Sequence, residues 1–260
     1  MPYNLKGRNV LITGSSKGLG AVLCRRFASE GSNIAINYMS SRNKAEQLAA
    51  SIEKEYSVKT CIVHGDVCTP ADNERIVKDT IEKLSGLDIV IANAGWTRFA
   101  KPGDIYDMSH DEWQKCWMAN VMSHVQLMQT ASPYMKQNPD GGVYLMTLSI
   151  AAVFPGGSSI PYSVTKAAAL HLVKHLACSM GSKIRVNAIL PGLLLTDWGN
   201  RYGTDAIAKM KNGSILKQET LLEDCAEAFV SLSKNTSTTG EHVLVDSGFL
   251  VGTSTGRASL

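Results

Sequence analysis

The sequence predicts a single α/β domain, in which a parallel sheet of about seven strands carries helices on both faces. Short apolar runs alternate along the chain with longer stretches whose apolar residues recur at helical spacing. A glycine-rich turn joins the first apolar run to the first helical stretch. No proline- or serine-rich linker divides the 260 residues, so residues 1–260 are expected to fold around one large core.

Strands and helices are expected to alternate through most of the chain. In the first helical stretch, for example, Leu19, Val22, Leu23 and Phe27 share one face. The predicted strands are Asn9–Thr13, Asn33–Tyr38, Lys59–Val63, Leu87–Ala92, Gly142–Leu148, Ile184–Leu190 and His242–Val245. The predicted helices are Gly18–Ser29, Lys44–Tyr56, Ala71–Leu84, Trp113–Met135 and Tyr162–Cys178. Each crossover between parallel strands should be right-handed.

Residues 196–217 do not follow this alternation. They contain Trp198, Tyr202, several charged residues and no clear strand, so an irregular or short-helical insertion is expected beside the sheet. Insertions of this length are often lids over a binding site. We therefore expect residues 196–217 to form a substrate-binding lid within the single domain.

The composition argues against several classes of protein. The formal net charge is only +3 and no long basic block occurs, which gives no sign of a nucleic-acid or membrane-surface partner. The six cysteines are scattered without a Cys-x-x-Cys pair, as expected of reduced thiols in the cytoplasm. His171 and His175 lie one helical turn apart without a nearby acidic or Cys ligand, so no metal site is expected. The terminal Ala-Ser-Leu resembles a peroxisomal Ser-Lys-Leu signal only loosely, and peroxisomal import is the less favoured alternative.

The turn after the first strand carries the glycines of a phosphate-binding loop. Glycines at this place permit a tight turn and a close approach of the backbone to a pyrophosphate, whose charge the following helix N-terminus stabilises. The sequence thus predicts a Rossmann-type, doubly wound sheet that binds a dinucleotide; a glycine turn without a ligand is the alternative. The candidate residues here are Gly14, Ser16, Lys17, Gly18, Leu19 and Gly20.

The end of the second predicted strand favours NADPH over NADH. A carboxylate here usually binds the ribose 2′-hydroxyl of NAD, but no acidic residue occurs between Gly31 and Lys44. Lys17 and Arg42 could instead bind a 2′-phosphate, unless both are simply solvated surface charges. Asn37, Ser40, Ser41 and Arg42 are the candidate cofactor-binding residues of this segment.

Tyr162 and Lys166 form a candidate acid/base pair. They lie four residues apart and would share a helix face. A free phenol titrates near ~10, and a nearby ammonium group should lower that pKa. Such a tyrosine could donate a proton to a developing alkoxide, or accept one in the reverse reaction.

These motifs occur in the order found in the short-chain dehydrogenase/reductase family, which the chain resembles over about residues 5 to 250. Lys17 and the Asn-Tyr-x-Ser end of the second strand look like the NADPH-preferring branch, and the chain is similar to fungal-type ketoreductases. The remaining matches are Asp66 and Val67 beside the adenine, Asn93, Ala94 and Gly95 closing the fourth strand, catalytic Asn120 and Ser149, and Pro191, Gly192, Leu194 and Thr196 around the nicotinamide.

The resemblance implies a role for each catalytic residue. Tyr162 would be the acid/base, and Lys166 would lower its pKa and bind the ribose. Ser149 would hydrogen-bond the reacting oxygen, and Asn120 would hold a water that links Lys166 to solvent. The family also commonly assembles as homotetramers or homodimers through the two long helices.

The predicted activity is therefore NADPH-dependent reduction of a ketone to a secondary alcohol. The alternatives are an NADP-dependent alcohol dehydrogenase working in the oxidative direction, a biosynthetic enzyme that couples reduction to a non-redox step, and a binding module without turnover. An aromatic bias in the loops after the strands suggests a bulky, partly apolar small-molecule substrate. The candidate substrate residues are Trp96, Phe99, Phe154, Leu193, Trp198 and Tyr202.

Overall fold

A single parallel sheet organises the molecule. The computed structural model describes residues 3–254, and within them the sheet has seven strands in the order β3-β2-β1-β4-β5-β6-β7. The first strand pairs with β2 on one side and β4 on the other, and the chain reverses its direction of winding between these two neighbours. The predicted doubly wound fold is confirmed. The strands are β1 Asn9–Ile12, β2 Asn33–Tyr38, β3 Thr60–His64, β4 Ile89–Ala92, β5 Gly142–Thr147, β6 Ile184–Pro191 and β7 His242–Val245.

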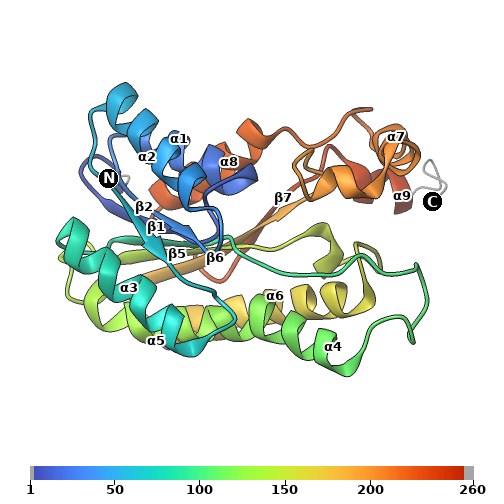
Figure 1. The fold of residues 1–260 in the computed structure, drawn as a ribbon, viewed down its shortest axis with the longest axis horizontal. Helices are drawn as coiled ribbons and strands as arrows, with labels where there is room; N and C mark the ends of the chain where they lie inside the picture. The colour runs from blue at the N-terminus through green and yellow to red at the C-terminus, as the bar shows by residue number, and fades with distance from the viewer. Residues whose placement is uncertain (1–2, 255–260) are drawn as a thin grey trace.

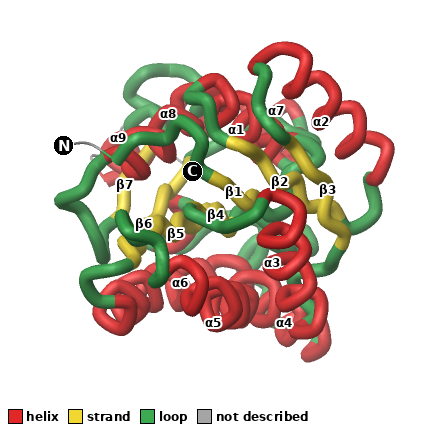
Figure 2. Tube along the Cα trace, turned by 90° about the vertical axis from the view of Figure 1, so that its left-hand side faces the viewer, coloured by secondary structure: helices red, strands yellow, loops and turns green. Residues whose placement is uncertain are grey.

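Helices cover both faces of the sheet, as Figure 1 shows and the end-on view of Figure 2 repeats. On one face lie α1 Gly18–Ser29, α2 Arg42–Tyr56 and α8 Leu222–Lys234. On the other lie α3 Pro70–Leu84, α4 His110–Trp117, α5 Ser123–Met135 and α6 Ile160–Met180. The two remaining α-helices of the described part are α7 Thr204–Gly213 and α9 Phe249–Ser254, which pack against each other at the end of the sheet.

The strands are buried on both faces, which explains why they are almost continuously apolar. Successive residues of β1 point to opposite sides of the sheet. Val10 and Ile12 pack in the core with Phe27 and Phe229, whereas Leu11 packs in the other core with Tyr144. This alternation fixes the strand register and holds the carboxyl ends of the strands at one edge.

Several helical features were not predicted from the sequence. The helix expected over Trp113–Met135 begins earlier, where Ser109 caps α4 in a capping box with Glu112, and a π-helical turn at Met118–Met122 interrupts it. Two further helices, α8 between β6 and β7 and α9 after β7, were not expected from the sequence. The expected insertion at residues 196–217 holds a short 3₁₀ helix, Gly199–Tyr202, and α7.

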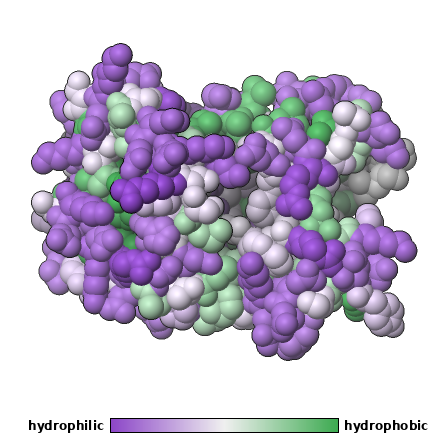
Figure 3. All heavy atoms as spheres, in the orientation of Figure 1, coloured by the Kyte–Doolittle hydropathy of each residue, from purple (hydrophilic) through white to green (hydrophobic). Residues whose placement is uncertain are grey.

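The surface carries mainly hydrophilic side chains, and Figure 3 shows hydrophobic ones in smaller groups between them. Within residues 3–254, no helix combines the length and apolarity that crossing a bilayer requires. All six cysteines are free, and the same residues contain no cluster of three or more metal-ligating side chains. The Ala-Ser-Leu end, considered above as a targeting signal, lies outside the described residues.

Candidate active site

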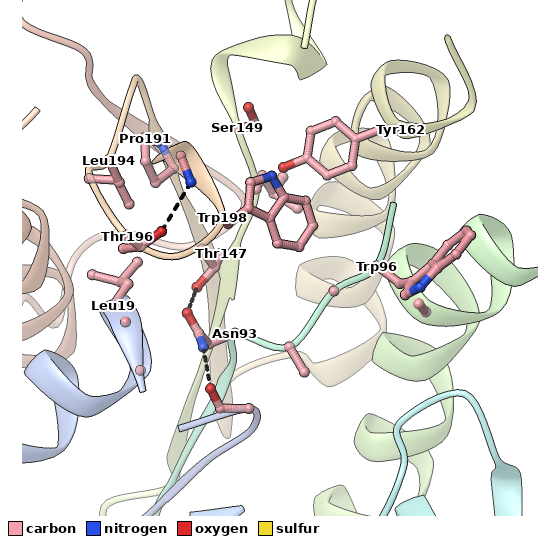
Figure 4. Close-up of a pocket in the computed structure, with 18 of the residues that line it drawn as sticks. Leu19, Asn93, Trp96, Thr147, Ser149, Tyr162, Pro191, Leu194, Thr196 and Trp198 are labelled. Carbon is pink, nitrogen blue, oxygen red and sulfur yellow. Dashed lines mark hydrogen bonds between the residues drawn. The ribbon is translucent and has the colours of Figure 1, made fainter. Parts of the chain in front are cut away.

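A cavity of about 860 Å³ lies at the carboxyl edge of the sheet. Its wall includes the loops that follow β1, β2, β3, β4, β5 and β6, together with part of the insertion at residues 196–217. This edge is where open parallel sheets bind their ligands. Figure 4 shows Ser149, Tyr162 and Trp198 close together in one part of the cavity, while Leu19 and Asn93 lie in another.

The glycine loop between β1 and α1 has the shape of a phosphate cradle. Gly14 and Gly18 have φ angles of 61° and 57°, a conformation that side-chain-bearing residues rarely adopt. A Cβ atom on Gly20 would lie 2.6 Å from Ser15 Cα, so only glycine fits there. No acidic residue occupies the first turn of α1, and the predicted loop residues Gly14, Ser16, Lys17, Gly18, Leu19 and Gly20 all line the cavity. The start of α1 can therefore accept an anion.

The end of β2 presents a neutral wall. Tyr38, Met39, Ser40 and Ser41 line the cavity without a carboxylate among them. Asn37 also lines it, but its side chain holds the frame of the site: Oδ1 accepts the Gly14 amide at 2.9 Å, and Nδ2 donates to backbone carbonyls of the β3 segment. This wall suits a 2′-phosphate better than a carboxylate-bearing wall would.

The two cations predicted to bind a 2′-phosphate differ in position. Lys17 lines the cavity, and its Nζ lies 3.1 Å from Asp197 Oδ2. This ion pair joins the glycine loop to the insertion at residues 196–217. Arg42 is absent from the cavity wall, and its Nε instead lies 2.8 Å from Glu46 Oε1, one turn along α2. The alternative of a solvated surface charge thus describes Arg42 in this structure.

Hydrogen bonds hold the ends of β1, β4 and β5 together. Thr13 Oγ1 accepts the amides of Asn93 and Ala94, both at 3.0 Å, and Asn93 Nδ2 donates to the Thr13 carbonyl. Thr147 Oγ1 donates to Asn93 Oδ1 at 3.2 Å (Figure 4). The cavity floor is therefore rigid where three strands meet. Asp66, Val67, Asn93, Ala94 and Gly95 all line it, as do Pro191, Gly192, Leu194 and Thr196 on the far side.

Tyr162, Lys166 and Ser149 meet at the cavity wall. Tyr162 lies in the first turn of α6, which Ser159 caps by accepting the Tyr162 amide, and Lys166 follows one turn later. Ser149 follows β5 and begins a 3₁₀ turn, in which its Oγ accepts the Ala151 amide. All three line the same cavity, with the Tyr162 ring pointing toward Trp198 in Figure 4.

Lys166 is a buried ammonium group without a carboxylate partner in the described residues. Its Nζ donates to the Thr147 carbonyl at 2.8 Å and lies 5.5 Å from the centre of the Tyr162 ring. Burial lowers the pKa of Lys166 to about 8, because the charged form loses solvation. The chain thus places a proton-exchanging amine directly beside the phenol.

The expected lowering of the Tyr162 pKa is wrong for the structure as it stands. Burial raises the pKa of the phenol above its ordinary value, Tyr202 raises it further, and only a hydrogen bond from Ser149 opposes them. Lys166 does not offset this, since burial weakens its own charged form. The phenol is therefore protonated at neutral pH, the form that can donate a proton.

Asn120 lies behind the cavity wall, in the π-helical turn. Its amide group holds Trp96 at both backbone atoms, with Oδ1 accepting the amide and Nδ2 donating to the carbonyl at 2.9 Å each, and Nδ2 also contacts Thr165 Oγ1. A Cβ on Gly95 would lie 2.8 Å from Asn120 Oδ1, so the glycine permits this approach. Asn120 is fully buried and does not itself line the cavity.

Most of the predicted substrate residues line the cavity: Trp96, Phe154, Leu193, Trp198 and Tyr202. Phe99 does not line it but packs edge-on behind Tyr202, with ring centres 4.8 Å apart. The rings of Trp198 and Tyr162 lie 5.7 Å apart, which places the aromatic wall beside the phenol. Sequence reasoning missed other lining residues from the same loops and from α4, α7 and α9, among them Lys115, Asp197, Arg201, Met210 and Phe249.

Comparison with known proteins gives consistent matches over nearly the whole chain. The sequence model of the family described as enoyl-(acyl carrier protein) reductase matches residues 14–250. L-rhamnose 1-dehydrogenase (NADP(+)) of Thermoplasma acidophilum is 32% identical over 253 residues, covering 95% of this chain and 98% of that protein.

Two solved structures share the fold at similar coverage. The NADPH-dependent 3-quinuclidinone reductase of Rhodotorula rubra has a TM-score of 0.87 and 26% identity, covering 95% of this chain and 93% of that one. A short-chain dehydrogenase of Burkholderia cenocepacia in complex with NADP has a TM-score of 0.87 and 27% identity, covering 95% of this chain and 100% of that one.

Proposed function

Because the chain belongs to the short-chain dehydrogenase/reductase family of oxidoreductases, we propose that it reduces a ketone to a secondary alcohol with NADPH. The observation that carries this proposal is the phenol of Tyr162, which lies beside the buried Lys166 and shares the wall of a large cavity with Ser149. A neutral phenol is a proton donor, and an alkoxide forming at a carbonyl needs one.

The residues at the sheet edge fit the proposed cofactor. Gly14, Gly18 and Gly20 leave room for a pyrophosphate at the start of α1, and the end of β2 has no carboxylate to repel a 2′-phosphate. Lys17 supplies the positive charge at this end of the cavity. NADPH, when bound, supplies the hydride that reduces the carbonyl carbon.

The chain's own groups have separate tasks in this proposal. Tyr162 donates its proton to the reacting oxygen, and Ser149 hydrogen-bonds the same oxygen and orients it. Lys166, whose Nζ lies 5.5 Å from the centre of the Tyr162 ring, binds the ribose. Asn120 positions the loop at Trp96 through its two hydrogen bonds to the Trp96 backbone.

The reverse reaction, oxidation of an alcohol, uses the same groups and needs Tyr162 as the base. The rhamnose dehydrogenase is a relative whose name places it in that direction. We favour reduction because a similar solved structure is that of an NADPH-dependent 3-quinuclidinone reductase. Coupling to a later non-redox step has no separate support among the residues of the cavity.

The insertion at residues 196–217 is proposed as the substrate lid. Trp198, Tyr202 and Met210 from this segment line the cavity next to Phe154 and Phe249. These side chains give the reacting end an aromatic, mainly apolar wall, which suits a bulky ketone.

The experiment is a panel of ketones followed by NADPH absorbance, with the wild type and Tyr162→Phe side by side. We expect turnover of bulky aryl or cyclic ketones by the wild type and a large loss in the variant. No consumption of NADPH with any ketone of the panel, together with consumption of NADP⁺ with the corresponding alcohols, would assign the oxidative direction instead.

A further inference from the structure

Arg201 is a cavity-lining arginine whose guanidinium group has no anionic partner in the described residues. Every other arginine of residues 3–254 donates a hydrogen bond to a carboxylate or to a backbone carbonyl. Arg201 instead lies over the Phe99 ring, with its Cζ atom 4.5 Å from the ring centre. Contact with an aromatic face leaves the N–H groups at the edge of the guanidinium free to donate.

The Phe99 contact also holds Arg201 at a defined place. Phe99 packs edge-on against Tyr202, the next residue of the lid, with ring centres 4.8 Å apart. Two consecutive lid residues therefore rest on the same ring, which belongs to the loop after β4. A guanidinium placed in this way is better ordered than an isolated surface side chain and loses less entropy when it binds.

Arg201 lies toward the reacting end of the cavity. The ring of Trp198, three residues earlier, lies 5.7 Å from the Tyr162 ring, and Tyr202, the next residue, lines the same cavity. Lys115 lies over the Trp96 ring in the same kind of contact. The remaining charged side chains of the wall bond to protein groups: Lys17 to Asp197, Lys166 to the Thr147 carbonyl, and Asp66 to the Cys68 amide.

We propose that the substrate is a ketone that carries a carboxylate some carbons away from its carbonyl group, and that Arg201 binds this carboxylate. This inference rests on the proposed function and names its substrate class. The planar guanidinium fork matches a carboxylate with two parallel hydrogen bonds. A carboxylate matches the one positive charge of Arg201, whereas a phosphate monoester would bring nearly two negative charges.

The test compares two aryl ketones of the same shape, γ-benzoylbutyrate and its primary amide. We expect the wild type to favour the acid over the amide by about 10- to 100-fold in kcat/KM, as for a charge-assisted hydrogen bond. The difference should lie mainly in KM, because the carboxylate is remote from the reacting carbon. It should shrink as salt is added, since Arg201 is solvent-exposed.

Three variants separate the role of Arg201 from general charge effects. Arg201→Gln should remove the preference for the acid, and Arg201→Lys should retain part of it, since the charge remains but the fork is lost. Lys209→Gln is the matched control, because Lys209 belongs to α7 but does not line the cavity. It should leave the preference unchanged.

Calorimetric binding of the two probes to the wild type and to Arg201→Gln tests the inference without turnover. Equal affinity of the wild type for acid and amide, or an unchanged preference in Arg201→Gln, overturns the assignment of Arg201 while leaving ketone reduction intact. A failure of the proposed function has a different signature: the acid binds through Arg201, yet NADPH is not consumed with either probe or with any neutral ketone.

Discussion

The ion pair between Lys17 and Asp197 gives a quantitative prediction about cofactor choice. If Lys17 binds the 2′-phosphate of NADPH, it must first leave Asp197, whose carboxylate lies 3.1 Å away in the structure. Both side chains are more than half exposed, at 54% and 71%, so the pair is weak and easily broken. Asp197→Asn should therefore tighten NADPH binding by about two- to five-fold, the amount that an exposed ion pair contributes. NADH affinity should stay nearly constant, because NADH has no 2′-phosphate.

The matching variant, Lys17→Ala, should weaken NADPH binding by about 10-fold or more, since a charge-assisted contact is lost. Fluorescence titration of both cofactors against wild type, the two single variants and the double variant gives a complete cycle. In the Lys17→Ala background, Asp197→Asn should have no further effect on NADPH. The competition between Asp197 and the phosphate would be refuted if Asp197→Asn raised the affinity for NADH as much as for NADPH. It would also be refuted if Asp197→Asn still raised the NADPH affinity in the Lys17→Ala background.

Lys166, Ser149 and the outer faces of α5 and α6 carry three more predictions. Lys166→Met should stabilise the fold at pH 7 by up to about 3 kcal/mol, because burial lowers the Lys166 pKa from 10.5 to about 8. Between pH 8 and pH 10.5, Lys166 keeps its proton only in the unfolded chain. The added free energy of unfolding of the variant should therefore shrink as the pH rises through this range, and denaturant unfolding measures it. Ser149→Ala should lower turnover, because the partner of Ser149 is the substrate oxygen. Its NADPH affinity, measured by fluorescence titration, should stay that of the wild type. Light scattering should give a mass above the 28.0 kDa of one chain, because Tyr134 and Val164 expose apolar surface there; a monomer at micromolar concentration contradicts this.

The sheet could be predicted from the sequence because its strands are buried on both faces. Val10, Leu11 and Ile12 all lie at 0% exposure, and such a strand is a continuous apolar run. The glycine loop was predictable for a related reason. Backbone geometry at Gly14 and Gly20 leaves no alternative residue, so the requirement is visible in the sequence itself.

Two helical features differ in how visible they are. The sequence of α8 does carry a signal, since Cys225, Ala226, Phe229 and Val230 recur at helical spacing and pack in the core. The π-helical turn carries none. Asn120, within this turn, bonds to Trp96 and Thr165, which are distant in sequence, and local pattern does not reveal such contacts.

The cavity wall shows the same division between local and long-range causes. Arg42 pairs with Glu46 four residues on, a contact that helical spacing alone suggests. The partners of Lys17 and Phe99 come from the insertion at residues 196–217, far along the chain, and needed the three-dimensional structure. The Tyr162 pKa was predicted from one neighbouring charge, but burial of the phenol and of Lys166 outweighs that charge.

Turnover of the Tyr162→Phe variant tests the central claim most directly. The change removes only the hydroxyl, so the fold and the cofactor cradle should remain. We expect kcat for ketone reduction to fall by about 10²- to 10⁴-fold, the usual contribution of general acid catalysis, while NADPH affinity stays within about two-fold of wild type. Near-normal turnover with intact NADPH binding would contradict the account, because the family fold would then be present without the proton donor assigned to it.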